Sequence, residues 1–356
     1  MIGNRLKIAR GAAGLSLREL QAKIGNLVTA QAIGKYERNE AMPGSDVLVG
    51  LAQALDVSED YLLDDENLVL EDVEFRKKDV SSKRHESQIR AKTLDLLGRY
   101  LAVEELLAMP SVNWNKPREA PYPVREMGDA ESAARRLREA WGLGLDPIPD
   151  LFELLEEQGI KTLALDQDGI DGLSSRVRRP GHEPVPVIVV NQGDWGERQR
   201  FTLAHELGHL VMDVAPSLNE EKAAHRFAGA FLMPDEALWR EIGKHRSSIG
   251  WGELFQFKVL FGVSVQALTY RCKDLGIFPD ALFRGLFEEF KRQGWRDPPY
   301  KEPHALPSER PKRFERLCYR ALAEDAISDS RAAELLGISV HILTQRMDSP
   351  PSVTNE

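Results

Sequence analysis

The residues best placed to do chemistry form the pattern His205-Glu206-Leu207-Gly208-His209. The surrounding stretch reads as a helix, and helical residues four apart share one face, so His205 and His209 can reach one metal ion. Two imidazoles and a carboxylate form a common catalytic zinc set, with a fourth position left for water. Glu206 lies about 100° around the helix from the first histidine and can contact that water without binding the metal. The pattern predicts hydrolysis, with Glu206 taking a proton as water attacks a carbonyl carbon and passing it to the leaving nitrogen.

The third ligand is expected on the following helix, which the apolar pattern places over Asn219–Met233. Asn219 is a suitable N-cap for that helix. The helix offers three candidates for the third ligand, namely Glu220, Glu221 and His225. Glu221 and His225 are one turn apart, so the spacing allows either of them to face the metal.

A second candidate site lies near the amino terminus, where residues 4–62 divide into five short helical patterns. Ser16 is a good cap for the second helix and Thr29 for the third, and a tight turn at Gly25 separates them. Two short helices joined in this way form a helix-turn-helix, which presents its second helix to the major groove of DNA. The positions expected to face the groove are Thr29, Ala30, Gln31 and Lys35. Glutamine can pair with adenine edges, and lysine with guanine or phosphate.

Helices and strands of modest length are expected to hold the metal helix in place. The sequence predicts helices over Ala133–Trp141 and Pro149–Gln158, then strands over Ile160–Leu165, Asp171–Arg178 and Pro186–Asn191. The predicted fold class is therefore mainly α with a small α+β domain. It consists of a five-helix head and a body that contains a short β-sheet.

The composition narrows the protein class. Of the 356 residues, 42% are hydrophobic and 29% are charged, which is typical of a soluble globular protein. The two cysteines, Cys272 and Cys318, exclude a disulfide framework and indicate a reducing cytoplasm. We find neither a signal-peptide core nor an apolar run of membrane-spanning length, so we expect a cytoplasmic protein with no membrane partner. The net charge of −9 argues against a general nucleic-acid coat, although bases outnumber acids over residues 1–45.

Changes in charge and clusters of proline predict four parts of the chain. They are a helix-turn-helix head over 1–65, a helical linker over 66–124, a metal-binding body over 125–295 and a C-terminal helical extension over 296–356.

Two further helical features have more than one interpretation. Ser82–Ala108 is an amphipathic helix that is either a dimer seam or, as we favour, packed on its own chain. Residues 330–340 form another helix-turn-helix-like pair around Gly337. That pair is either a second DNA reader or, as we favour, a packing or dimer element.

The head resembles the phage-repressor-like (XRE) helix-turn-helix family. The resemblance is carried by Leu15–Leu20, Thr29–Arg38 and Leu51–Leu62, and the turn Asn26-Leu27-Val28 is slightly longer than the commonest form. It implies binding to double-stranded operator DNA, where Arg38 is expected to contact phosphate. Because one such head buries little surface, we expect a homodimer on a two-fold operator.

The body resembles the ImmA/IrrE family of zinc metallopeptidases. The resemblance is carried by Arg200–His209, Glu221–Ala224, Phe227-Ala228 and Leu232–Pro234. It implies a zincin-like body in which His205, His209 and Glu221 bind Zn2+ and Glu206 is the catalytic base. His225 stands where the family commonly has another residue, which keeps it as a residue that supports the ligands or as an alternative ligand.

The two resemblances together imply a bacterial regulator that binds DNA and carries a zinc-dependent endopeptidase. In such fusions the protein substrate is typically a repressor-type regulator, cut during a stress or mobile-element response. One alternative is a non-proteolytic DNA-binding regulator whose zinc domain senses metal or a ligand. Another is the toxin or effector half of a toxin–antitoxin pair. An intact Glu206 favours a hydrolytic protein over a sensor.

Overall fold

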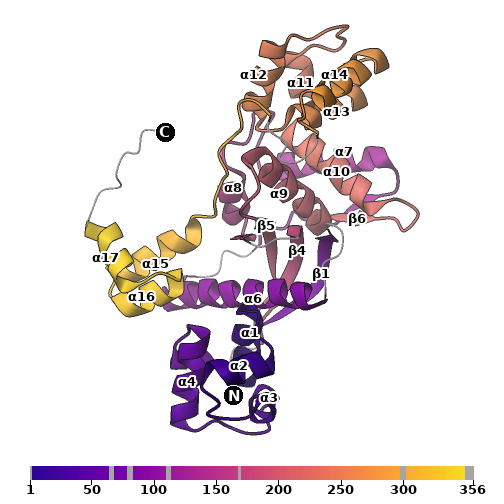
Figure 1. Ribbon diagram of the computed structural model, residues 1–356. Helices are drawn as coiled ribbons and strands as arrows, with labels where there is room; N and C mark the ends of the chain where they lie inside the picture. The colour runs from indigo at the N-terminus through magenta and orange to yellow at the C-terminus, as the bar shows by residue number, and fades with distance from the viewer. Residues whose placement is uncertain are drawn as a thin grey trace.

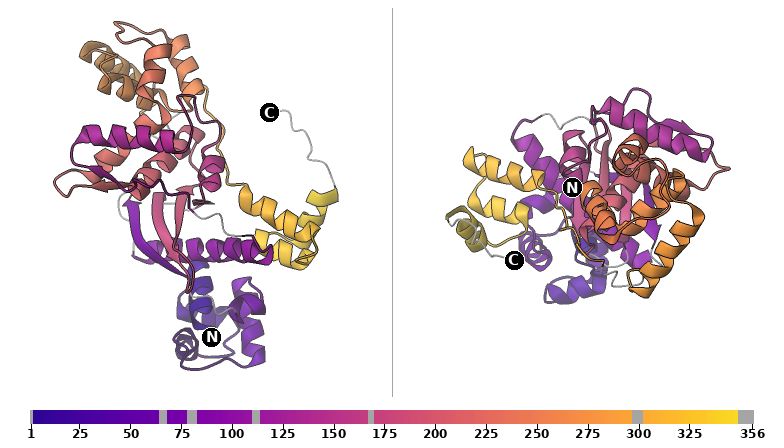
Figure 2. Two further views of the ribbon diagram at one scale, coloured as in Figure 1. Left: turned by 180° about the vertical axis from the view of Figure 1, so that it is seen from behind. Right: turned by 90° about the horizontal axis from the view of Figure 1, so that it is seen from above.

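The computed structural model describes residues 2–63, 68–77, 83–109, 114–166, 170–296 and 302–348. A small helical head and a larger α+β body lie on opposite sides of one long helix, α6 (Lys83–Leu106), as Figures 1 and 2 show. Among the described residues, no helix is both long enough and apolar enough to cross a membrane. The predicted fold class, mainly α with a small α+β domain, is confirmed.

Five helices form the head, and the second and third begin directly after their predicted caps, Ser16 and Thr29. They are α1 (Gly3–Ala12), α2 (Leu17–Lys23), α3 (Ala30–Glu37), α4 (Ser45–Leu55) and α5 (Glu59–Leu63). The Ser16 hydroxyl accepts a hydrogen bond from the Glu19 amide, and the Glu19 carboxylate accepts one from the Ser16 amide. The Thr29 hydroxyl accepts from the Ala32 amide at 3.2 Å. These caps satisfy the first amides of α2 and α3 and so fix where each helix begins.

The body is built on one mixed sheet with the strand order β1-β4-β5-β3. Its strands are β1 (Val69–Lys77), β3 (Lys161–Leu165), β4 (Ile170–Arg178) and β5 (Val185–Asn191). Strand β4 is antiparallel to both neighbours, whereas β3 and β5 are parallel. The three predicted strands are confirmed to within one residue at each end. Strand β1 lies inside the region 66–124, where the sequence predicted a helical linker, and was not predicted as a strand.

Helices cover both faces of this sheet. Val187 and Val189 of β5 face α6, whereas Ile188 and Val190 face α9 (Gly196–Val211), because successive strand residues point to opposite sides. The helices of the body are α7 (Met127–Ala140), α8 (Leu151–Glu157), α9 (Gly196–Val211), α10 (Glu220–Leu232), α11 (Asp235–Glu241), α12 (Trp251–Phe261), α13 (Val265–Asp274) and α14 (Asp280–Arg292). A second, two-stranded sheet pairs β2 (Tyr122–Val124) with β6 (Met212–Val214) in parallel. Helices α9 and α10 pack side by side and so bring the predicted ligands together.

Helix α6 packs against its own chain, as the sequence analysis favoured. Leu97 and Leu101 are buried against the sheet. Tyr100 and Val103 are buried against the C-terminal helices. The amphipathic pattern of this helix therefore has two apolar stripes, and each of them is covered within the chain.

The head rests on α6 through a close approach of two helices. The Arg5 guanidinium lies 5.1 Å from the centre of the Tyr61 ring and is buried beside α6. A side chain at Gly98 would place its Cβ 2.5 Å from Arg5, and one at Gly11 would place its Cβ 2.8 Å from Ala91. Glycine at positions 11 and 98 is thus what lets α1 lie against α6.

Three helices end the described chain, and they pack at the C-terminal end of α6. They are α15 (Arg313–Ala323), α16 (Asp329–Leu336) and α17 (Val340–Asp348). Gly337 ends α16 with a positive φ of 66°, as a helix-turn-helix-like pair requires. The carboxylate of Glu334 accepts a hydrogen bond from the amide of Ser58 in the head at 2.8 Å. The C-terminal pair is therefore a packing element that contacts both α6 and the head.

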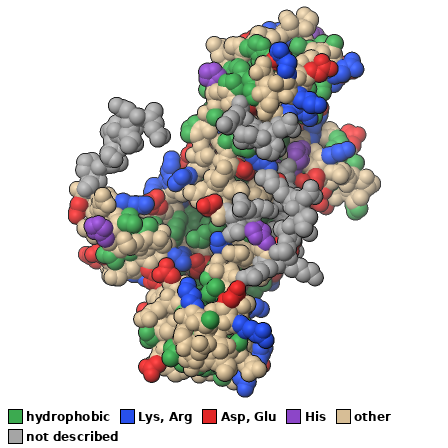
Figure 3. All heavy atoms as spheres, viewed as in Figure 1, with side chains coloured by type: hydrophobic (Ala, Val, Ile, Leu, Met, Phe, Trp, Pro, Cys, Tyr) green, Lys and Arg blue, Asp and Glu red, His purple; other side chains and the backbone are tan. Residues whose placement is uncertain are grey.

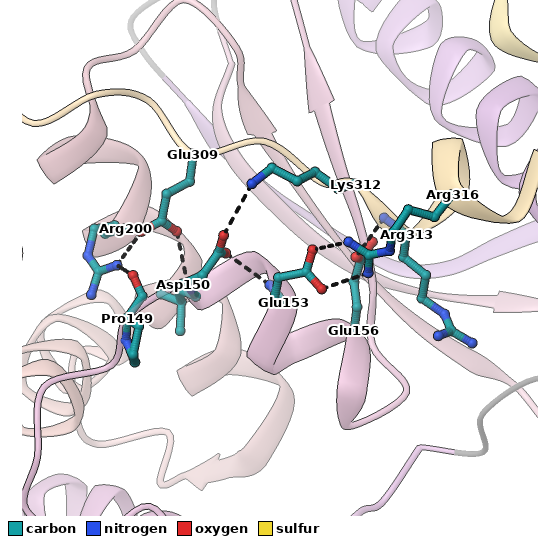
Figure 4. A network of polar contacts seen from close by, with 10 residues as sticks. Pro149, Asp150, Glu153, Glu156, Arg200, Glu309, Lys312, Arg313 and Arg316 are labelled. Carbon is teal, nitrogen blue, oxygen red and sulfur yellow. Dashed lines mark hydrogen bonds and ion pairs between the residues drawn. The ribbon is translucent and has the colours of Figure 1, made fainter. Parts of the chain in front are cut away.

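Residues 302–312 connect the body to these helices and lie along the amino-terminal end of α9. Figure 4 shows the polar network there, in which Glu309 pairs with Arg200 of α9 and Arg316 pairs with Glu153 of α8 at 2.6 Å. The amide of Gly196 donates to the carbonyl of Leu306 at 3.3 Å. The segment thus connects the C-terminal helices to the beginning of α9.

Candidate functional site

Helices α9 and α10 bring three of the predicted residues to one point. The Nε2 atoms of His205 and His209 are 3.1 Å apart. The Glu221 carboxylate reaches both imidazoles, with Oε2 at 3.4 Å from Nε2 of His205 and Oε1 at 3.5 Å from Nε2 of His209. In the part of the chain that the structure describes, these three residues form the group of metal-binding type.

The spacing of the three residues fits a tetrahedral metal ion. Bonds of about 2.0–2.1 Å in a tetrahedral zinc site place neighbouring ligand atoms about 3.3–3.4 Å apart. The observed separations of 3.1, 3.4 and 3.5 Å lie close to that value. His205 is fully buried, whereas Glu221 is exposed, so the site opens to solvent on the side of α10. Three protein ligands with an open side are the arrangement of a catalytic zinc site.

Glu206 is held outside this ligand set. Its side chain is 1% exposed, and its Oε2 accepts a hydrogen bond from the hydroxyl of Ser174 on β4 at 2.8 Å. A Cβ at Gly172 would lie 2.6 Å from Oε1 of Glu206, so glycine at this position leaves space for the carboxylate. Strand β4 therefore positions the predicted base, and the sequence analysis did not identify Ser174 or Gly172.

The other two candidate ligands have different places. Glu220 lies 3.3 Å from Nδ1 of His209, the ring nitrogen opposite the one that faces Glu221. A carboxylate there favours the tautomer with the proton on Nδ1, in which Nε2 is the nitrogen that can bind a metal. His225 donates from Nδ1 to the carbonyl of Glu221 at 2.7 Å, and its ring centre is 4.5 Å from that of His205. His225 thus borders the centre, and of the three candidates only Glu221 meets both imidazoles.

The head presents its predicted DNA-facing residues to solvent. Thr29, Gln31, Lys35 and Arg38 are exposed, and Ala30 is half-buried at the start of α3. Figure 3 shows Lys and Arg side chains along the edge of the head on the α3 side. The helix therefore offers both polar and basic side chains to a groove.

Three side chains set the geometry of this surface. Gln21 accepts a hydrogen bond from the amide of Ala30 at 2.9 Å and so joins α2 to the start of α3. Arg38 forms a surface ion pair with Glu40 at 2.7 Å. Arg10 pairs with Glu37 at 2.5 Å inside the head, where Glu37 is almost buried. Arg10 is therefore a structural residue of the head and not a free phosphate contact.

Comparison with protein families finds one match over the head and one over part of the body. Residues 6–62 match the Helix-turn-helix family, and residues 155–273 match the IrrE N-terminal-like domain family. The chain joins a helix-turn-helix domain to an IrrE N-terminal-like domain. The second match contains His205, Glu206, His209 and Glu221. A search of curated proteins finds none that matches this chain.

Two cavities border the group of His205, His209 and Glu221 in the IrrE N-terminal-like domain. One, of about 370 Å³, has a polar lining that includes Ser174 and Arg176 of β4, His209 and Glu220. The other, of about 380 Å³, lies on the side of His225. Its more apolar lining includes Met127, Phe201, Ala267 and Tyr270. The centre therefore lies between a polar space beside the sheet and an apolar space between α9, α10 and α13.

Proposed function

We propose that this protein is a DNA-binding transcriptional regulator whose IrrE N-terminal-like domain is a zinc-dependent endopeptidase. The proposed substrate is a repressor-type protein. The observation that carries the proposal is the metal-ligand group of His205, His209 and Glu221 with Glu206 held separately beside it. A metal sensor needs the ligands alone, whereas hydrolysis also needs a base next to them.

The roles of the residues follow from their contacts. A zinc ion in this ligand group would polarise a carbonyl and lower the pKa of a water molecule. Glu206 follows His205 directly on α9, and we assign its carboxylate the role of accepting a proton and returning it to the leaving nitrogen. Ser174 fixes the position of that carboxylate, and Glu220 fixes the ring of His209. His225 lies close enough to interact with a bound peptide beside His205.

The helix-turn-helix domain supplies the second half of the proposal. Gln31 and Lys35 are exposed on α3 and are proposed to read base edges, while Arg38 contacts the backbone. One small head buries little DNA surface, so the proposed complex has two chains on a two-fold operator. The contacts to phosphate make the affinity fall as the salt concentration rises.

The test is co-expression of the protein with the products of neighbouring genes, using wild type, Glu206→Gln and His205→Ala. We expect a partner protein to be cleaved only by the wild type. Elemental analysis should find about one zinc per chain in the wild type and in Glu206→Gln, but none in His205→Ala, because His205 is a proposed ligand and Glu206 is not. A Glu206→Gln variant without zinc would show that the role of Glu206 is wrongly assigned. If the wild type contains zinc but cleaves no partner, the result would favour the alternative, a non-proteolytic regulator whose zinc domain senses metal or a ligand.

A further inference from the structure

Strand β4 has one edge that is suited to hold a peptide next to the metal centre. Its Ser174 contacts Glu206, and its Gly172 packs against the same side chain. Strand β5 pairs with one edge of β4, which leaves the backbone groups of the other edge for an added strand. Extended peptides bind to such edges through main-chain hydrogen bonds, and pockets receive their side chains. A substrate backbone on this edge would pass beside Glu206.

The chain itself fills that edge. Strand β1 runs antiparallel along β4, with Glu74 opposite Ser174 and Val69 opposite Arg178. The hydroxyl of Ser175 donates to the carbonyl of Glu71 in β1 at 2.6 Å. Glu71 also forms an ion pair with Arg178 at 2.6 Å. Strand β1 thus takes the place of a peptide on both sides of Ser174.

We infer that β1 is a built-in occupant of the substrate edge and that it keeps the peptidase inactive. A substrate can be held beside Glu206 only after β1 has left β4. This inference rests on the proposed endopeptidase function and adds its regulation.

Two features of the pairing between β1 and β4 would allow β1 to leave the sheet, namely its irregular ladder and its position at the sheet edge. The ladder is irregular at two points, between Glu71 and Glu74 and between Phe75 and Lys77. A bulge leaves a residue unpaired and weakens the ladder locally, and the first irregularity lies next to Ser174. Strand β1 is also at the end of the sheet, so its departure breaks one ladder and leaves β4, β5 and β3 paired.

Peptide binding to the full chain tests the inference without any cleavage. The probe is a fluorescein-labelled peptide with the sequence of residues 68–77, and the background is Glu206→Gln, so that the probe is not hydrolysed. Proline removes a backbone donor, and neighbouring strand residues point their N–H groups to opposite edges. Changing both Glu74→Pro and Phe75→Pro therefore removes one donor that faces β4. The matched control is Glu74→Ala with Phe75→Ala, which keeps both donors.

We expect the proline variant to bind the peptide at least tenfold more tightly than the parent chain, measured by fluorescence anisotropy. The alanine control should bind more weakly than the proline variant. Equal affinity of the folded proline variant and the parent chain would overturn the inference. Binding needs no hydrolysis, so the two proposals can fail separately. If the proline variant binds the peptide but a chain that keeps Glu206 cleaves no partner, the endopeptidase function alone is refuted.

A reversible disulfide between β1 and β4 tests the inference if the proline variant does not fold. Val69 and Arg178 are opposite each other in the ladder, and both side chains are exposed, so Val69→Cys with Arg178→Cys can form a cross-strand disulfide. The native Cys272 and Cys318 are buried and do not compete. The oxidised chain should bind the same peptide at least tenfold more weakly than the reduced chain. Equal binding by the oxidised and reduced chains would contradict the inference.

Discussion

Ser174→Ala tests the role of Glu206 without touching a metal ligand. The change removes the hydroxyl that donates to the Glu206 carboxylate at 2.8 Å, at a residue that is 1% exposed. A hydrogen bond to a charged group contributes about 1.5–3 kcal/mol, and each ~1.4 kcal/mol corresponds to about tenfold in rate. If the bond serves to hold the base for proton transfer, kcat should fall by about 10- to 150-fold.

The assay is cleavage of the partner protein at saturating concentration, together with the zinc content of each purified variant. The zinc content should stay at the wild-type level, because the Ser174 hydroxyl donates to Glu206, which lies outside the ligand group. Ser175→Ala is the matched control, since it makes the same change one residue further on, where the hydroxyl donates to Glu71 of β1. It should not lower kcat. Full activity of Ser174→Ala, with Glu206→Gln inactive, would refute the reasoning that β4 positions the base.

The remaining predictions concern the ligand set, the head and the stability of the body. Glu221→Ala should weaken zinc binding more than His225→Ala in a chelator competition, because only Glu221 meets both imidazoles; the opposite order would make His225 the ligand. Gln31→Ala should relax the sequence preference seen in footprinting while Glu206→Gln leaves it unchanged, since Gln31 is exposed on α3 and Glu206 is buried in the body. Burial raises the pKa of Glu156 from its ordinary 4.5 to about 7. The folded state therefore favours the protonated form of Glu156. The free energy of unfolding should fall by about 3 kcal/mol as the pH rises from 4.5 through 7. Urea unfolding should show that Glu156→Gln removes this loss; an unchanged pH dependence would contradict the assignment.

The helical part of the site could be predicted because it depends on local spacing. His205 and His209 share a helix face by periodicity alone, and the caps Ser16, Thr29 and Asn219 are each found where the sequence places them. Helix periodicity and capping act within a few residues of the chain, so a single sequence contains them. The choice of Glu221 over His225 required the family resemblance, because both lie one turn apart on the same helix.

The contribution of the sheet could not be predicted in the same way. Ser174 meets Glu206 across 32 residues of chain, and the contact depends on how β4 packs on α9. The signal was a pair of small residues, Gly172 and Ser174, at alternate positions of a buried strand, which is also an ordinary packing pattern. Strand β1 was missed for a different reason: the irregularity between Glu71 and Glu74 breaks the period-two alternation by which strands are recognised.

The head and helix α9 are linked by elements that pack along α6 and at its C-terminal end. Arg5 fixes the head to α6, and the bond from Ser58 to Glu334 fixes it to the C-terminal helices. Those helices continue from residues 302–312, whose Glu309 pairs with Arg200 on the metal helix. Strand β1 follows the head directly in the sequence and lies on the β4 edge. If β1 fills the substrate edge, as we infer, a displacement of the head is expected to act on that strand. A change confined to the Glu206 carboxylate leaves the contacts of Arg5, Ser58 and Glu309 in place. We therefore expect that regulation through the head and chemistry at the proposed metal site can each be altered without the other.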